Sequence, residues 1–218
     1  MNGPVDGPAD GPSDQVDAGH TPLDPDESDG LRLSWVRTRD DLNVAEADNI
    51  LAARRHLGRP SLDEVLDDLW LRRLHRAMFG DVWSWAGSYR STLKSIGIDP
   101  ALVAVAVRDL VGDVRVWIDA DPALGGDDTE EDRLVAGLRI AARFHHQLVW
   151  IHPFPNGNGR HARAAADCLL GALGFRVDLT WGRNIGDAAA ARARYIAALR
   201  RADEDREDLG ELVTFLRS

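Results

Sequence analysis

Apolar side chains recur every three or four residues along most of the chain from Leu31 onward, which is the spacing of one face of an α-helix. The longest such stretch follows Thr129, a residue type that commonly caps helix N-termini, and Pro153 should end it. Its apolar positions are Leu134, Leu138, Ala141, Phe144, Leu148 and Ile151. The stretch predicts a long amphipathic helix with one buried face.

Capping residues mark further helix starts. Ser61 and Glu64 have the spacing of a capping box, and leucines follow them at helical intervals. Asp99 is followed directly by proline, which is typical of a cap and a first helical position. The whole pattern predicts helices over 40–57 (begun by Asp40 or Asp41), after 61, after 99, from 129 to 151, over 157–173, over 187–202 and over 206–217.

The stretch from Trp85 to Ile98 lacks this periodicity. Gly87 and Gly97 flank short pieces of β-prone residues, which predicts a small β-hairpin or an extended flap. The predicted architecture is therefore an all-α helical domain over residues 31–218 that carries one flap.

Residues 1–30 differ in composition from the rest of the chain. They contain eight acidic residues, no Lys or Arg, five of the ten prolines and five of the twenty glycines. Such a segment buries too little apolar surface to offset the entropy of ordering it, so we expect a disordered acidic tail. A solvated tail is the simple interpretation, and an acidic interaction arm is the alternative. The tail also carries most of the net charge of −10, so that charge says little about the partners of the remaining chain.

The sequence suggests a cytoplasmic protein. The N-terminus has no basic and apolar regions of the kind that make a signal peptide, and no apolar run approaches the roughly 20 residues that span a bilayer. Cys168 is the single cysteine, so no disulfide forms within the chain. We expect neither membrane insertion nor direct binding of nucleic acid.

The strongest chemical signal is the run from His152 to Arg163, which reads HPFPNGNGRHAR. One predicted helix ends at its proline, and a second begins after two glycines that flank an asparagine. Glycines at a helix start let the backbone turn tightly and point consecutive N–H groups outward. Those N–H groups and the positive end of the helix dipole favour binding of an anion.

Three side chains add to this predicted anion site. Arg160 and Arg163 are three residues apart and share a helix face, and their planar donor forks suit phosphate oxygens. His152 lies at the other side of the loop and can accept a proton from a hydroxyl near neutral pH. Each feature alone is usually a turn, a packing residue or a solvated face; only their occurrence in one loop favours attack on a nucleoside triphosphate.

This run resembles the signature of the Fic family, His-x-Phe-x-(Asp or Glu)-Gly-Asn-Gly-Arg-x-x-Arg. The resemblance extends to residues 75–90, which are similar to the segment that leads into the family's target-docking flap, and to Phe144, His145, His146 and Ile151 before the motif. More narrowly, the chain from about Thr21 is similar to the subfamily called mobile mystery protein B.

The resemblance implies a protein adenylyltransferase that transfers AMP from ATP to a Ser, Thr or Tyr hydroxyl, with Mg²⁺ as charge partner. It implies that His152 is the general base and that Phe154 anchors the loop. It implies that the phosphates of ATP are bound by Gly157, Asn158, Gly159, Arg160 and Arg163. Asn158 and Arg160 would also be catalytic residues, together with His152. The segment from about Ser88 to Ile98, with Ser88, Arg90, Thr92 and Lys94, would dock the target backbone by strand addition.

Asn156 departs from the family pattern, which has Asp or Glu at this position. An amide offers Mg²⁺ a neutral carbonyl oxygen in place of a charged carboxylate, so Asn156 is expected to be a weak metal ligand. The departure keeps other interpretations open: a weak enzyme, transfer of another nucleotide or of phosphate, or removal of AMP.

Many Fic proteins carry an inhibitory helix whose Glu pairs with the second arginine of the motif. The segment Leu42–Ala47 matches that pattern only in part, and it suggests the hypothesis that Glu46 pairs with Arg163. An ordinary surface glutamate is the alternative.

Another class of function stays open, namely a catalytically weak nucleotide-binding module. The subfamily resemblance suggests a small helix-turn-helix protein as its partner, in a toxin–antitoxin-like pair. Among the remaining candidates, His161 is expected to face solvent. His145 and His146 should point to different faces without sharing a metal, and one of them could support the loop by a hydrogen bond. Lys94, the single lysine, is expected at the surface of the flap.

Overall fold

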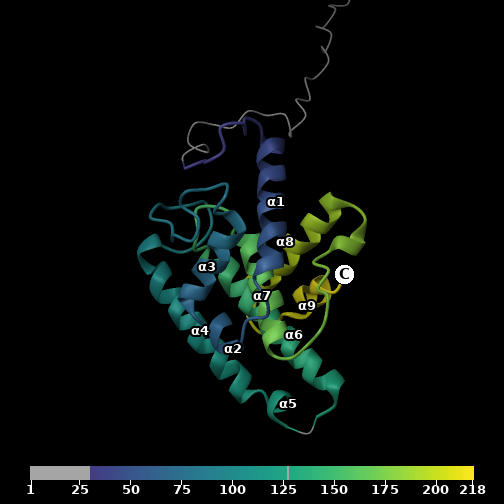
Figure 1. Cartoon of the computed structure of the whole chain (residues 1–218). Coiled ribbons are helices and arrows are strands. Elements are labelled where there is room, and N and C mark those ends of the chain that lie inside the picture. The colour runs from purple at the N-terminus through teal and green to yellow at the C-terminus, as the bar shows by residue number, and fades with distance from the viewer. Residues whose placement is uncertain (1–29, 127) are drawn as a thin grey trace, which may run out of the picture.

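A computed structural model describes residues 30–126 and 128–218 of the 218-residue chain. The expectations for the acidic tail fall on residues 1–29, which lie outside the described part. The described residues are predominantly helical (Figure 1). The α-helices are α1 (Arg39–His56), α2 (Leu62–Val65), α3 (Asp68–Phe79), α4 (Val103–Ala120), α5 (Pro122–Gly125), α6 (Glu130–Ile151), α7 (Asn158–Ala172), α8 (Ala188–Glu204) and α9 (Gly210–Leu216), with short 3-10 turns at Pro100–Leu102 and Arg183–Ile185.

Helices α6 and α7 form the centre of the domain (Figure 1). One hydrophobic cluster packs α1 to α4 against α6 and α7. A second cluster packs α8 and α9 against another face of the same two helices. The loop between α6 and α7, which holds the motif, is thereby fixed between two packed layers.

The predicted caps are present at most helix starts. The Thr129 hydroxyl accepts from the N–H of Asp132 at the start of α6, and the Asp99 carboxylate accepts from the N–H of Ala101. The first helix begins one residue earlier than expected. Its N-cap is Thr38, and Asp41 is the third-residue partner of a capping box.

The helix predicted after Ser61 is divided in two. Ser61 and Glu64 form the expected capping box, but Leu66 leaves the helical conformation with φ −92° and ψ 41°. Asp67 then caps α3 by accepting from the N–H of Leu69. The leucine spacing crosses this break, so periodicity alone could not show it.

The flap between α3 and α4 contains no strand. An isolated bridge joins Trp83, before this segment, to Leu31. The all-α fold class is confirmed, but the small β-hairpin expected within residues 85–98 does not form: these residues are turns, bends and irregular loop. No helix in residues 30–126 and 128–218 has both the length and the hydropathy to cross a membrane.

Candidate active site

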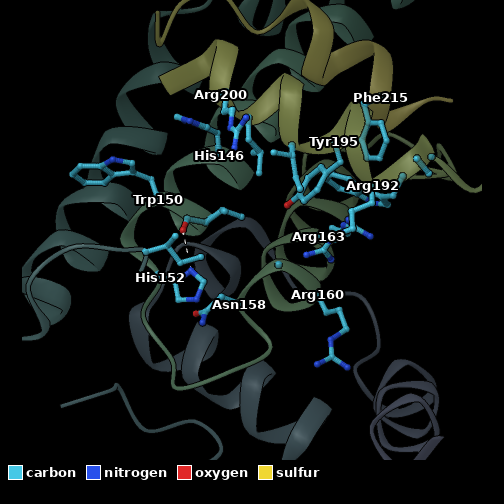
Figure 2. A pocket seen from close by; sticks show the side chains of 18 of the residues that line it. His146, Trp150, His152, Asn158, Arg160, Arg163, Arg192, Tyr195, Arg200 and Phe215 are labelled. Carbon is cyan, nitrogen blue, oxygen red and sulfur yellow. Dashed lines mark hydrogen bonds between the residues drawn. The ribbon is translucent and has the colours of Figure 1, made fainter. Parts of the chain in front are cut away.

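His152 is the C-cap of α6 and lies in the left-handed conformation, with φ 55° and ψ 60°. Its Nδ1 lies 3.3 Å from the carbonyl oxygen of Val149. A carbonyl only accepts, so the proton is on Nδ1 and Nε2 keeps a free lone pair. The ring lines the cleft beside the motif loop (Figure 2).

The imidazole of His152 is suited to act as a base at neutral pH. Burial holds the pKa of His152 below its ordinary value of 6.5, and the nearby charges of Arg90 and Lys94 act in the same direction. The hydrogen bond to Val149 opposes this effect. At pH 7 the ring is therefore neutral and can accept a proton through Nε2.

The loop after His152 is fixed by Phe154 and Asn158. Phe154 is fully buried and stacks on the His75 ring with a centroid separation of 3.8 Å. The Asn158 side chain accepts from the N–H of Phe154 and donates to its carbonyl oxygen, each at 2.8 Å. Phe154 is thus an anchor, and the Asn158 amide braces the loop while its backbone N–H is left for other partners.

The turn into α7 presents backbone N–H groups. Those of Asn158, Gly159 and Arg160 have no hydrogen-bond partner within the part of the chain that the structure describes. Gly157 has φ 78°, and a Cβ there would lie 2.6 Å from the Phe79 ring. A Cβ on Gly159 would meet nothing nearer than the Tyr195 hydroxyl at 3.8 Å. Packing therefore requires glycine at 157, whereas at 159 it leaves the backbone open to a ligand.

The two arginines of the motif have different surroundings. Arg160 forms an ion pair of 2.7 Å with Glu46 and lies over the Phe79 ring. Arg163 lies over the Tyr195 ring at 4.6 Å, and its buried Nε has no hydrogen-bond partner among the described residues. Glu46 does reach the motif, but it pairs with the first arginine. The hypothesis that it pairs with Arg163 was wrong.

Glu46 is a buried residue, not a surface glutamate. It is 2% exposed, and it also accepts from Nε1 of Trp83 at 2.7 Å. The inner face of α1 packs on α3, which brings this carboxylate to the N-terminus of α7. The sequence around Glu46 does not show which motif residue this carboxylate will meet, because the contact depends on how α1 packs on α3.

The motif forms one wall of a cleft of about 1380 Å³. Flap residues 96–98 and helix α8 also line this cleft, and Figure 2 shows Tyr195 and Arg200 of α8 across from His152. The side chains that α8 adds to it include Arg192, Tyr195, Arg200 and Asp203. Sequence analysis missed α8 as part of the cleft because an arginine-rich helix is usually a solvated face. The available signal was the spacing of Arg192 and Tyr195, three residues apart, which places them on one side of the helix.

His75 was also missed as a site residue. Its Nδ1 accepts from the N–H of Gly87 at 3.0 Å, so Nε2 carries the proton and donates to the carbonyl oxygen of Asn156, also at 3.0 Å. Burial holds the pKa of His75 well below 6.5, which keeps this tautomer neutral. One buried ring therefore joins the base of the flap to the motif loop.

The other histidines correct two expectations. His161 is buried and does not face solvent; its Nε2 lies 2.9 Å from the carbonyl oxygen of Leu71 on α3. His145 bonds the Tyr195 hydroxyl at 3.0 Å, and His146 bonds Asp203 at 2.8 Å. Neither of these two supports the loop directly. Both instead fasten α6 to the same helix, α8, so the expectation that they point to different faces is not confirmed.

The predicted docking residues of the flap divide into two groups. Thr92 and Lys94 are exposed and Ser88 is half-buried. Arg90 is 3% exposed, and its guanidinium points inward to backbone carbonyls. Arg90 therefore does not present its side chain to a target, because the flap folds over it.

The residues around Asn156 do not make a magnesium site by themselves. Asn156 is exposed and lines the cleft, but its Oδ1 already accepts from the N–H of Gly157 at 2.7 Å. No group of three or more His, Cys, Asp or Glu residues with metal-binding geometry occurs in the described ranges. Since Mg²⁺ is usually held by one or two carboxylates together with phosphates, the protein's donor set falls short at this position.

The fold and the site define an α-helical domain in which a neutral histidine lies beside an anion-binding helix N-terminus. The sequence model of the Fic/DOC family matches residues 65–170, from α2 to α7. The chain therefore carries a Fic domain, and the predicted family is confirmed. The narrower resemblance to mobile mystery protein B stays a prediction.

Curated relatives and solved structures agree with this assignment. The chain is 26% identical over 162 residues to the protein adenylyltransferase VbhT of Bartonella schoenbuchensis, covering 72% of this chain and 32% of VbhT. It is 27% identical over 158 residues to the protein adenylyltransferase fic-1 of Caenorhabditis briggsae, covering 72% of this chain and 26% of fic-1. The chain thus spans a third or less of these relatives' length.

The fold itself is matched by a solved Fic domain. The N-terminal Fic domain of Bep8, a VirB-translocated effector protein from Bartonella sp. 1-1C, superposes with a TM-score of 0.66 over 87% of this chain and 90% of that domain. The two are 14% identical, so this likeness establishes the fold alone.

Proposed function

We propose that this chain is a protein adenylyltransferase that transfers AMP from ATP to a Ser, Thr or Tyr hydroxyl of a target protein. The observation that carries the proposal is the neutral His152, which lines the cleft with its Nδ1 bonded to Val149 and its Nε2 unbonded among the described residues, beside the unpartnered N–H groups that begin α7. The names of the two curated relatives support the same reaction.

The reaction follows from the parts of the cleft. Nε2 of His152 takes the proton of the target hydroxyl, whose oxygen attacks the α-phosphorus of ATP. The bond from that phosphorus to the oxygen that bridges to the β-phosphate breaks, and pyrophosphate leaves. The N–H groups of Asn158 and Gly159 and the guanidiniums of Arg160 and Arg163 stabilise the charge on the phosphates.

The exposed part of the flap is where the target would bind. Residues 91–97 are exposed, and Gly97 lies directly against His152. The exposed backbone of this loop can add a strand to an extended target segment, which would bring a hydroxyl to Nε2. Thr92 and Lys94 remain the flap side chains proposed to contact the target, and Ser88 lies at the base.

The proposed magnesium ion would be held mainly by the phosphates of the nucleotide. The chain offers it the neutral oxygen of Asn156 and no carboxylate in the motif loop. The charge on the leaving pyrophosphate is therefore assigned mostly to Arg160, Arg163 and the helix N-terminus.

The first test is labelling with ATP that carries the label on its α-phosphate, using the protein alone and a cell lysate. His152→Ala should reduce labelling by about 10² to 10⁴-fold, the usual contribution of a general base. His56→Ala is the matched control, because His56 is exposed on α1, far in sequence from the motif. Labelling that is equal in His152→Ala and wild type would refute the proposal.

A second candidate is a nucleotide-binding module with little or no transfer activity. Asn156 and the engagement of Arg160 by Glu46 favour it, since both weaken the handling of phosphates. This candidate predicts that ATP raises the melting temperature while neither α- nor γ-phosphate label is transferred. Label from the γ-phosphate alone would indicate phosphate transfer, and release of AMP from modified proteins would indicate the reverse reaction. A tight one-to-one complex with a small helix-turn-helix protein would support the toxin–antitoxin-like pairing.

A further inference from the structure

Arg90 bonds backbone carbonyls from two parts of the chain. Nε donates to the carbonyl oxygen of His152 at 2.6 Å, and Nη2 lies 3.4 Å from that of Ile151. On the flap side, Nη1 donates to the carbonyl of Thr92 at 3.0 Å, and Nη2 donates to that of Ile98. The guanidinium therefore lies between the end of α6 and both arms of the flap.

This set of acceptors fits the chemistry of arginine. The last carbonyls of a helix have no partner within the helix and form the negative end of its dipole. A guanidinium offers several N–H donors in one plane, so it can satisfy carbonyls on different sides at once. A lysine ammonium would keep the charge of Arg90 but could not reproduce this fork.

The backbone on which Arg90 acts is unusual. His152 has a φ of 55°, a conformation that costs free energy in residues other than glycine and that persists when surrounding contacts fix it. The backbone N–H of Arg90 also donates to the carbonyl of Pro153 at 2.9 Å. Arg90 thus contacts three consecutive backbone carbonyls, those of Ile151, His152 and Pro153.

The flap packs tightly against the backbone of His152. A Cβ on Gly97 would lie 2.5 Å from Cβ of His152 and 2.9 Å from Nη2 of Arg90. Arg90 itself is 3% exposed, so it is enclosed by the groups that it joins. A shift of the flap would therefore displace His152, and a shift of His152 would displace the flap.

We propose that Arg90 is a positioning residue that locks the flap and the backbone of His152 into one unit, so that the imidazole and the target-docking loop keep a fixed relative geometry. The inference rests on the proposed role of His152 as base. It replaces the expectation that Arg90 contacts the target, and it explains why a buried cation directly precedes the exposed residues 91–97.

The test compares Arg90→Lys and Arg90→Ala with a matched control, Arg72→Ala. Arg72 also donates to a backbone carbonyl of this segment, that of Gly87 at 3.0 Å, and lies over the Tyr89 ring, but it has no bond to His152 or to residues 92–98. Two readouts do not depend on transfer activity: hydrogen exchange of the Ile98 amide, which donates to the carbonyl oxygen of Ile151, and the ring nitrogen signals of His152 in a ¹⁵N-histidine-labelled full chain. His152→Gln identifies those ring signals by their loss.

Both Arg90 variants should speed the exchange of the Ile98 amide and change the His152 ring signals, whereas Arg72→Ala should match wild type. The two variants differ in charge. The charges that act on His152 are those of Arg90 and Lys94 on the flap, and both hold its pKa down. Arg90→Ala should therefore raise the pKa of His152, and Arg90→Lys should raise it less.

Label transfer should fall by about 10²-fold in Arg90→Lys, the scale of loss when a reacting group is displaced by about 1 Å. Wild-type exchange and wild-type ring signals in Arg90→Lys would overturn the inference, and so would equal changes in Arg72→Ala. If Arg90→Ala does not fold, Arg90→Lys decides alone. Because exchange and ring signals are read without ATP, a failure of this inference is distinguishable from a failure of the proposed transfer activity.

Discussion

Glu46 and Arg160 form an ion pair of 2.7 Å that joins α1 to the first turn of α7. The pair is asymmetric, because the Glu46 side chain is 3% exposed and that of Arg160 is 39% exposed. The buried carboxylate is held in addition by Nε1 of Trp83. Arg160 is therefore fixed by a partner that would compete with the phosphates it is proposed to bind.

Removal of the Glu46 charge should release Arg160 and increase label transfer. Glu46→Gln keeps an oxygen that accepts from Trp83, so the packing of α1 is retained. The gain should be about fivefold, since a partly exposed ion pair contributes about 1 kcal/mol. The measurement is the initial rate of α-phosphate labelling. Asp48→Asn is the control, because Asp48 is exposed on the same helix. Unchanged or lower labelling in Glu46→Gln would assign the pair a purely structural role.

The two glycines of the turn should respond differently to alanine. Gly157→Ala places a Cβ at a φ of 78° and 2.6 Å from the Phe79 ring, so it should cost about 2 kcal/mol or more of folding stability. Gly159→Ala meets nothing within 3.4 Å and should leave the melting temperature unchanged. Its methyl group would instead obstruct a phosphate at the helix N-terminus.

The readout for this pair is the melting temperature with and without ATP. Gly157→Ala should lower it without ligand, and Gly159→Ala should reduce only the increase that ATP produces. If Gly159→Ala binds ATP as tightly as wild type, the phosphates do not contact this turn.

Acid should destabilise the fold through its buried histidines. Burial lowers the pKa of His145 to about 3 and that of His161 to about 4, from 6.5. Between these values the unfolded chain binds more protons than the folded one, so stability falls as the pH falls below 6.5. Each histidine should lower the free energy of unfolding by about 2 kcal/mol at pH 5 relative to pH 7.

Asp167 acts in the opposite direction and provides a control for that prediction. Burial raises its pKa from 3.8 to about 6, so its contribution to stability is lost as the pH rises through 6. Asp167→Asn keeps an acceptor for Nε1 of Trp181, which now bonds the carboxylate at 2.8 Å. The melting temperature of this variant should fall more steeply between pH 6 and pH 4.5 than that of wild type; an equal slope would contradict the assignment.

The helices and the motif were predictable because their signals are local. Apolar spacing and capping residues placed the helices, and the motif alone placed His152, Gly159 and the two arginines around one loop. The residues that determine a helix cap or the motif loop are close together in the sequence, so a short stretch of sequence is enough to predict them.

The errors concern contacts between distant parts of the chain. Glu46 was matched to Arg163 by family pattern, but the packing of α1 on α3 sets its register and brings it to Arg160. His161 seemed to face solvent because no local pattern shows that α3 covers it. The flap residue Arg90 turned out to be buried for a related reason: its acceptors are carbonyls, and a sequence does not show where carbonyls point.

Asn156→Asp should lower the magnesium concentration that half-maximal labelling requires. The substitution adds a charged oxygen at the exposed end of the motif loop, where the described residues present only a neutral amide. The measurement is the initial labelling rate as a function of Mg²⁺ concentration, with Asn184→Asp as a control because Asn184 is exposed and lies outside the motif loop. An unchanged Mg²⁺ dependence would mean that the ion is held by the nucleotide phosphates and not by the side chain at position 156. That side chain would then act only through its bond to the N–H of Gly157.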